Sequence, residues 1–208
     1  MAITNGYCTL NEVKSAARIT DNTDDVLLEN CIEAASRRID GFVNRFFYQI
    51  SATISLYLTD TNVVGPYAYN QYTLSIPDLY SITTLKSDDD GDGTFETTWT
   101  QNTDYRLEPL DTVLQTRPYN KIIAIGAKSF PVIFQPPMPG MQVQGVWGWP
   151  AIPDDVREAA IIMSLRLFSR YNSPLGVLGF GEMGAVTVRA VDPDIREMLS
   201  PYREIAIA

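Results

Sequence analysis

The sequence of 208 residues predicts an α+β protein, in which a small helical bundle is interrupted by a large β-rich lobe. Apolar residues recur at helical spacing near both ends of the chain. Between Ser51 and Trp149, threonine, tyrosine and valine dominate, and glycine, proline, asparagine and aspartate recur at short intervals. We therefore expect residues 1–50 and 150–208 to form the helical core, and residues 51–149 to form an inserted sandwich or small barrel.

Two helices are predicted before the lobe, over about residues 9–19 and 23–47. Thr9 and Glu12 form the T-x-x-E pattern of a capping box at the first of them. In the second, apolar residues spaced by four and three align along one face for five turns. This face consists of Leu28, Ile32, Ala35, Ile39, Phe42 and Phe46.

A third helix is predicted over residues 153–171, and its apolar residues fall into two stripes. One stripe is Val156, Ala160, Met163 and Leu167, and the other is Ile161, Leu165 and Phe168, nearly opposite. A helix that is apolar on two sides has to be covered on both. Either it is the central helix of one core, or Ile161, Leu165 and Phe168 form an interface with a neighbouring subunit.

The segment after this helix is rich in glycine and apolar residues, and exposing such a loop to water is costly. A partner surface that covers it would remove this cost. Residues 186–190 then alternate as in a strand that pairs with another chain, and a last short helix is predicted over about 193–200. The candidate partner-binding residues are Leu175, Val177, Phe180, Met183, Val186, Val188 and Arg189.

Composition excludes several classes of function. The formal net charge of −9 argues against a protein that grips DNA by neutralising its phosphates. The chain has no histidine, which removes the commonest general base and metal ligand and argues against an enzyme. No apolar run is long enough to cross a bilayer, and the N-terminus lacks the pattern of a secretion signal.

Two short motifs resemble binding sites, but one is incomplete and the other has the wrong structural context. Asp88, Asp90 and Asp92 match the first half of a calcium loop, but Trp99 stands where the bidentate glutamate belongs. We interpret residues 87–93 as an acidic hairpin turn, with these three aspartates as a weak candidate metal site. Residues 179–184 match G-x-G-x-x-G, but a predicted helix precedes them and a strand follows, the reverse of a dinucleotide fold. We therefore predict no cofactor.

The order of elements, with GVWGWP at 145–150 leading into a PDDV helix start at 153–156, resembles the head–tail connector proteins of long-tailed bacteriophages. The resemblance is strongest over residues 7–47 and 143–203. It implies a non-enzymatic virion protein of the neck, made in the host cytoplasm. Twelve copies would form a ring beneath the portal, dock the next neck or tail component, and let DNA pass through the lumen without specific binding.

Two other functions remain open from the residues. The acidic hairpin and the aromatic residues would suit a β domain that binds a sugar or calcium, carried on a helical stalk. Another ring of the neck, such as a stopper or tail terminator, is the second alternative, although the extensive helical ends argue against it.

Overall fold

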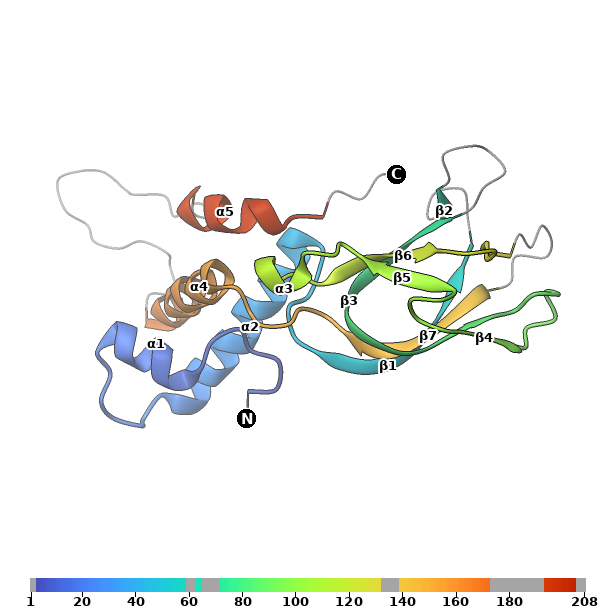
Figure 1. Cartoon of the computed structure of the whole chain (residues 1–208). Helices are drawn as coiled ribbons and strands as arrows, with labels where there is room; N and C mark the ends of the chain where they lie inside the picture. The colour runs from blue at the N-terminus through green and yellow to red at the C-terminus, as the bar shows by residue number, and fades with distance from the viewer. Residues whose placement is uncertain (1–2, 59–62, 65–71, 132–138, 173–192, 205–208) are drawn as a thin grey trace. The chain divides into compact units, whose positions relative to one another are not determined.

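The computed structural model describes residues 3–58, 63–64, 72–131, 139–172 and 193–204 (Figure 1). It confirms the α+β class, since the described residues form helices and one antiparallel sheet. The chain divides into two compact units, which we call the helical unit (residues 1–48 and 152–208) and the β lobe (residues 49–151). That each unit is an independent domain stays a prediction. None of the described helices combines the length and hydropathy that a bilayer span requires.

The helical unit contains the four predicted helices. They are α1 (Leu10–Ala17), α2 (Asp25–Val43), α4 (Asp154–Asn172) and α5 (Pro193–Leu199), and a 3-10 turn, η1 (Ser200–Tyr202), follows the last. The capping box at α1 is confirmed: the Glu12 amide donates to Thr9 Oγ1 at 3.3 Å, and the Thr9 amide donates to Glu12 Oε2 at 2.6 Å. Helix α4 packs against α1, α2 and α5.

The apolar face predicted for α2 is correct except at its end. Leu28, Ile32, Ala35 and Ile39 are fully buried. Phe42 and Phe46 are only half-buried, and Val43 and Phe47 enter the core in their place. The helix ends at Val43 because Asn44 adopts a left-handed conformation, with φ 58°, which an asparagine tolerates.

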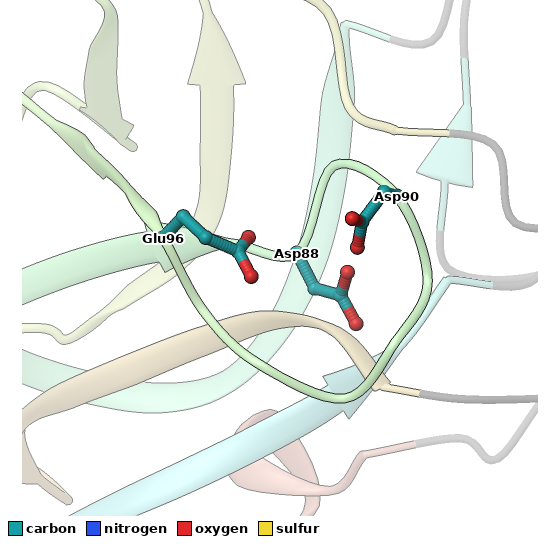
Figure 2. A group of neighbouring side chains, drawn as sticks. All are labelled: Asp88, Asp90 and Glu96. Carbon is teal, nitrogen blue, oxygen red and sulfur yellow. The ribbon is translucent and has the colours of Figure 1, made fainter.

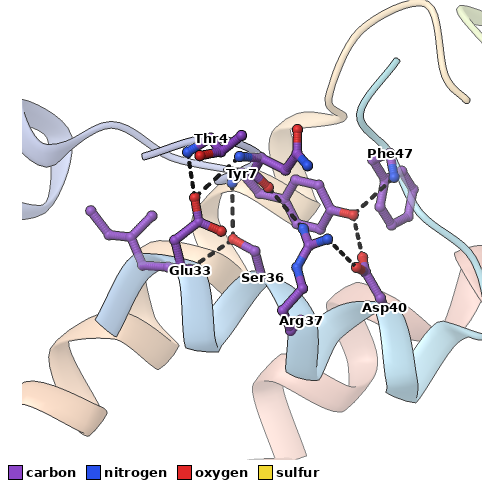
Figure 3. Close-up of polar contacts among 9 residues, drawn as sticks. Thr4, Tyr7, Glu33, Ser36, Arg37, Asp40 and Phe47 are labelled. Carbon is purple, nitrogen blue, oxygen red and sulfur yellow. Dashed lines mark hydrogen bonds and ion pairs between the residues drawn. The ribbon is translucent and has the colours of Figure 1, made fainter. Parts of the chain in front are cut away.

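A cluster of polar contacts binds the N-terminal segment to α2 (Figure 3). We call this cluster the N-terminal clamp; it consists of Tyr7 in the segment and Glu33, Ser36, Arg37 and Asp40 of α2. Glu33 Oε1 accepts hydrogen bonds from the amides of Thr4 at 2.5 Å and Asn5 at 3.1 Å. Ser36 Oγ accepts from the Tyr7 amide at 3.0 Å and donates to the carbonyl of Ile32. These bonds satisfy backbone groups of a segment that has no regular secondary structure of its own.

Tyr7 is the centre of the clamp. Its ring is buried, and its hydroxyl donates to Asp40 Oδ1 and accepts from the Phe47 amide at 2.9 Å. Arg37 forms an ion pair with Asp40 at 3.1 Å, and its guanidinium lies 5.6 Å from the centre of the Tyr7 ring. The Tyr7 side chain therefore joins the N-terminal segment, the last turn of α2 and the chain that leaves α2.

The described residues of the β lobe form a seven-stranded antiparallel sheet with the main order β1-β7-β3-β6-β5, and β2 and β4 also pair with β3. Its elements are β1 (Ile50–Tyr57), β2 (Val63–Val64), β3 (Thr73–Ser87), β4 (Thr97–Trp99), β5 (Tyr105–Glu108), the short helix α3 (Thr112–Gln115), β6 (Tyr119–Ala124) and β7 (Pro139–Trp147).

The long strand β3 organises the lobe because it changes partner along its length. Residues 73–79 pair with β6, and residues 79–87 pair with β7. The ladder to β6 is irregular between Ser75 and Leu79, where Pro77 has no amide hydrogen to donate. Such partner switches form the corners of sheets. The side chains of Leu74, Leu79 and Leu85 along this strand are fully buried.

The hairpin predicted within the lobe is confirmed. β3 and β4 form a hairpin in which Leu85 pairs with Trp99 and Ser87 with Thr97, so residues 88–96 make its loop. Trp147 and Trp149 are buried, and they anchor the end of β7: Trp149 Nε1 donates to Asp78 Oδ2 at 2.9 Å, and Trp147 Nε1 donates to the Ala52 carbonyl at 3.1 Å.

Candidate assembly surfaces

Helix α4 buries its two predicted stripes to different extents. In the first stripe, Val156 and Ala160 are fully buried, while Met163 and Leu167 are half-buried. In the second, Ile161, Leu165 and Phe168 are all half-buried. The described residues of the same chain therefore leave part of the second stripe uncovered. Met163 and Leu167 of the first stripe are equally half-buried, so the role of the second stripe at a subunit interface stays a prediction.

Several polar residues of α4 have partners within the helical unit. Asp154 and Asp155 lie in the first turn, where carboxylates interact favourably with the helix dipole. Arg157 pairs with Asp154 at 3.1 Å and lies 4.0 Å from Glu12 of α1. Ser164 Oγ donates to the Ala160 carbonyl, which satisfies a hydroxyl that is fully buried.

The predicted partner-binding residues, Leu175, Val177, Phe180, Met183, Val186, Val188 and Arg189, lie outside the described residues. We refer to residues 175–191 as the C-terminal arm. Its role stays a prediction.

The structure shows an apolar surface that the sequence analysis missed. Leu110, which precedes α3, is 74% exposed, and Val113 and Leu114, within α3, are 89% and 87% exposed. No other large apolar side chain among the described residues is as exposed. The composition of residues 51–149 is typical of strands, so no helix was predicted within them. The available signal was the segment Leu110–Leu114, in which apolar residues recur at three and four positions rather than at two.

The acidic hairpin brings some of the candidate metal ligands together (Figure 2). Carboxylate oxygens of Asp88, Asp90 and Glu96 lie within 4.8 Å of one another, whereas Asp92 is not part of this group. Asp88 is fully buried, and its two oxygens accept hydrogen bonds from the amides of Gly91 at 2.6 Å and Gly93 at 2.9 Å. Asp88 therefore already serves as the internal cap of the loop.

Neighbouring side chains reinforce the hairpin. Ser87 and Thr97 each donate a hydrogen bond of 2.6 Å to Asp89, and these bonds, that of Ser87 foremost, lower the pKa of the Asp89 carboxyl. Trp99 Nε1 donates to Ser87 Oγ at 2.9 Å, and its ring stacks on Phe130 with centroids 5.4 Å apart. These hydrogen bonds and the stacked rings connect the acidic loop to the core of the lobe.

We expect Asp88→Ala to lower the free energy of unfolding of the β lobe by about 2–3 kcal/mol, because the buried carboxylate that accepts hydrogen bonds from the Gly91 and Gly93 amides is lost. Glu96→Ala is the matched control: Glu96 is exposed, and its loss should change stability by less than about 0.5 kcal/mol. Thermal unfolding with calcium and with chelator measures both. Calcium-dependent stability that Glu96→Ala removes would contradict a purely structural hairpin.

The fold defines the class of this chain: an α+β protein in which the strands of a sheet lie, in chain order, between the two long helices α2 and α4 of a helical unit. Residues 7–73 match the family model described as phage gp6-like head-tail connector protein. This match covers α1, α2 and the first strands, and it confirms the resemblance to head–tail connector proteins inferred from the sequence. No curated protein matches the chain.

Solved structures of similar fold extend the likeness to the whole chain. One is described as the neck of an empty GTA particle computed with C6 symmetry, with 17% identity, a TM-score of 0.55, and coverage of 100% of this chain and 95% of that chain. Another is the neck of a native GTA particle computed with C12 symmetry, with 20% identity, a TM-score of 0.54 and coverage of 100% and 94%. A third, of the virion of a native gene transfer agent particle, is 20% identical with a TM-score of 0.52.

Proposed function

We propose that this chain is a structural, non-enzymatic subunit of the neck of a phage or phage-like particle, and that it forms an adaptor ring between the portal and the tail. The observation that carries the proposal is the agreement of two independent likenesses. The N-terminal helices match the connector family, and the full chain shares the fold of chains from solved necks.

The number of subunits in the proposed ring is twelve. The C6 and C12 symmetries of the similar neck structures support this number, since both are compatible with a twelve-fold arrangement. A cyclic ring needs two different, complementary surfaces on each subunit, because each copy contacts the next head to tail. The half-covered stripe of Ile161, Leu165 and Phe168 on α4 is our candidate for one of these surfaces.

The proposed ring continues the DNA channel and docks the next neck or tail component. The net charge of −9 per subunit supports passage of DNA without specific binding, because an acidic lumen offers no counterion-release affinity for phosphates. The C-terminal arm is our candidate for engagement of the portal.

A deletion tests the portal contact. We expect the chain without residues 175–191 to lose co-sedimentation with the portal protein of the same particle, while helix α4 and the β lobe keep their circular dichroism and tryptophan fluorescence. The matched control is Asp92→Ala, in the exposed hairpin, which should sediment with the portal as the intact chain does. Undiminished binding by the deletion variant would contradict the arm as the portal-binding segment.

A further inference from the structure

The sequence contains a single asparagine that is followed by glycine, Asn5 before Gly6, in the segment that the N-terminal clamp holds (Figure 3). This dipeptide is especially prone to spontaneous deamidation, because glycine has no side chain to shield its attacking amide nitrogen. The packing favours glycine here: a methyl group on Gly6 would lie 2.5 Å from Ile3 Cγ2 and 2.9 Å from Ile32 Cγ2. The close approach of the segment to α2 therefore keeps a labile dipeptide in the fold.

The backbone around this dipeptide is held on both sides. The Asn5 amide donates to Glu33 Oε1 at 3.1 Å, and the Asn5 carbonyl accepts from the Arg37 guanidinium at 2.8 Å. On the other side, the Tyr7 amide donates to Ser36 Oγ at 3.0 Å. The clamp therefore fixes the orientation of the peptide groups next to the reactive side chain.

The Asn5 side chain itself is not engaged. Its carboxamide forms no hydrogen bond with any described residue, so its Cγ is open to attack. Ring closure requires the Gly6 nitrogen to reach Asn5 Cγ, which needs a backbone conformation outside the broadly allowed regions. Rotation of the Asn5 backbone toward that conformation would move its carbonyl away from Arg37. The reaction therefore has to start from a state in which the clamp is open.

We propose that Asn5–Gly6 is a deamidation site controlled by the N-terminal clamp. Opening of the clamp permits the modification, and the modified segment can no longer restore the closed clamp. The rate of a reaction that occurs only in a locally open state follows the equilibrium population of that state. Loss of clamp bonds should therefore accelerate the reaction. The proposal does not depend on the adaptor role.

The reaction needs only water, and no group is oxidised or reduced. The Gly6 nitrogen forms a bond to Asn5 Cγ and loses its proton, while the Cγ–Nδ2 bond breaks and ammonia leaves. Water then opens the cyclic imide. Cleavage of the new bond leaves aspartate at position 5, and cleavage of the original main-chain bond leaves isoaspartate.

The isoaspartate product is incompatible with the closed clamp. It lengthens the main chain by one carbon between the two amides that donate to Glu33 and Ser36, so both bonds cannot form at their original spacing. It also adds a carboxylate to a residue whose own amide lies 3.1 Å from the Glu33 carboxylate, and like charges repel. Both changes favour the open segment.

Peptide mass spectrometry of the full chain, incubated at neutral pH, tests the site. The tryptic peptide that ends at Lys14 contains Asn5 and also Asn11, which is followed by glutamate in α1 and is the internal control. We expect aspartate and isoaspartate to accumulate at position 5 and not at position 11. Conversion at position 5 should be at least about tenfold faster in denaturant than in the folded chain.

Two clamp variants test the control of the rate. Glu33→Ala removes the acceptor of two clamp bonds and should accelerate conversion at position 5 at least about tenfold. Glu158→Ala, at an exposed glutamate of α4, is the matched control and should change the rate less than about twofold. Tyr7→Phe keeps the buried ring and should also accelerate conversion, so it decides the question if Glu33→Ala unfolds the helical unit.

A third variant tests the consequence for the clamp. Asn5→Gln has a longer side chain that cyclises slowly, so its clamp should stay closed during incubation. Hydrogen exchange at the Tyr7 and Phe47 amides should accelerate with incubation in the intact chain and not in Asn5→Gln. Equal exchange in both would overturn the effect on the clamp. Rates that both clamp variants leave unchanged would overturn control by the clamp, and no conversion in denaturant would overturn the site.

Discussion

Gly145→Ala is expected to lower the free energy of unfolding of the β lobe by at least about 3 kcal/mol. Gly145 lies on β7, where it pairs with Ala52 of β1 on one side and with Ile82 of β3 on the other. A methyl group at this position would lie 2.3 Å from the Ser81 carbonyl oxygen and 3.2 Å from the Ile82 Cα. The obstructing atoms are backbone, so relief requires β3 and β7 to separate.

Gly41→Ala is the matched control for this substitution. Gly41 lies within α2, and an added methyl group there would meet no atom within 4 Å. Alanine has the higher helix propensity, so we expect a gain of about 0.5–1 kcal/mol. Denaturant titration of both variants gives the comparison. A Gly145→Ala protein as stable as the wild type would show that β3 and β7 are not paired as described.

Tyr7→Phe is expected to destabilise the helical unit by about 3 kcal/mol. The substitution keeps the buried ring and removes only the hydroxyl. Asp40 then loses a donor, and the Phe47 amide loses the hydroxyl as acceptor. Tyr48→Phe is the control, because the Tyr48 hydroxyl has no hydrogen bond within the described part of the chain, and we expect a change below about 0.5 kcal/mol.

The effect of Tyr7→Phe should depend on pH. Burial raises the pKa of Asp40 above its ordinary value of 3.8, and the hydrogen bond from Tyr7 partly offsets this rise. When folding raises the pKa of a carboxyl, the free energy of unfolding falls as pH rises from the pKa of the unfolded chain through that of the folded protein. The reason is that the carboxyl ionises more easily in the unfolded chain. Without the Tyr7 hydroxyl this cost grows. The deficit of Tyr7→Phe should therefore be larger at neutral pH than near pH 3.8, and a deficit independent of pH would contradict this account.

The two substitutions also test whether the two units are independent domains. The three tryptophans, Trp99, Trp147 and Trp149, all lie in the β lobe, whereas the long helices all lie in the helical unit. Tryptophan fluorescence therefore reports the lobe, and helical circular dichroism reports the helical unit. If the units are separate domains, Gly145→Ala shifts the fluorescence transition alone and Tyr7→Phe shifts the helical transition alone.

The sequence was most informative where local chemistry decides the structure. The capping box at Thr9, the face of α2 from Leu28 to Ile39 and the hairpin after Ser87 all depend on spacings within a few residues. The end of α2 was mispredicted because Asn44 can adopt a left-handed conformation, so that Val43 and Phe47 replace Phe42 and Phe46 in the core. The spacing of the apolar residues does not predict that Asn44 ends the helix.

Features that depend on distant residues could not be predicted. The switch of β3 from β6 to β7 needs the partner strands to be known, and so does the close approach of Gly145 to Ser81. In the hairpin, the carboxylate beside Asp88 and Asp90 is Glu96 rather than Asp92, because the loop folds back on itself. The exposure of Leu110, Val113 and Leu114 likewise follows from the tertiary fold, since an apolar residue in the sequence is normally assigned to the core.

Cryo-electron microscopy of the chain bound to the portal of its own particle tests the adaptor role most directly. We predict a closed ring of twelve copies stacked coaxially on the portal, with its lumen continuing the channel. Single copies scattered on the portal, or a portal without added density at saturating concentrations of the chain, would contradict the adaptor role.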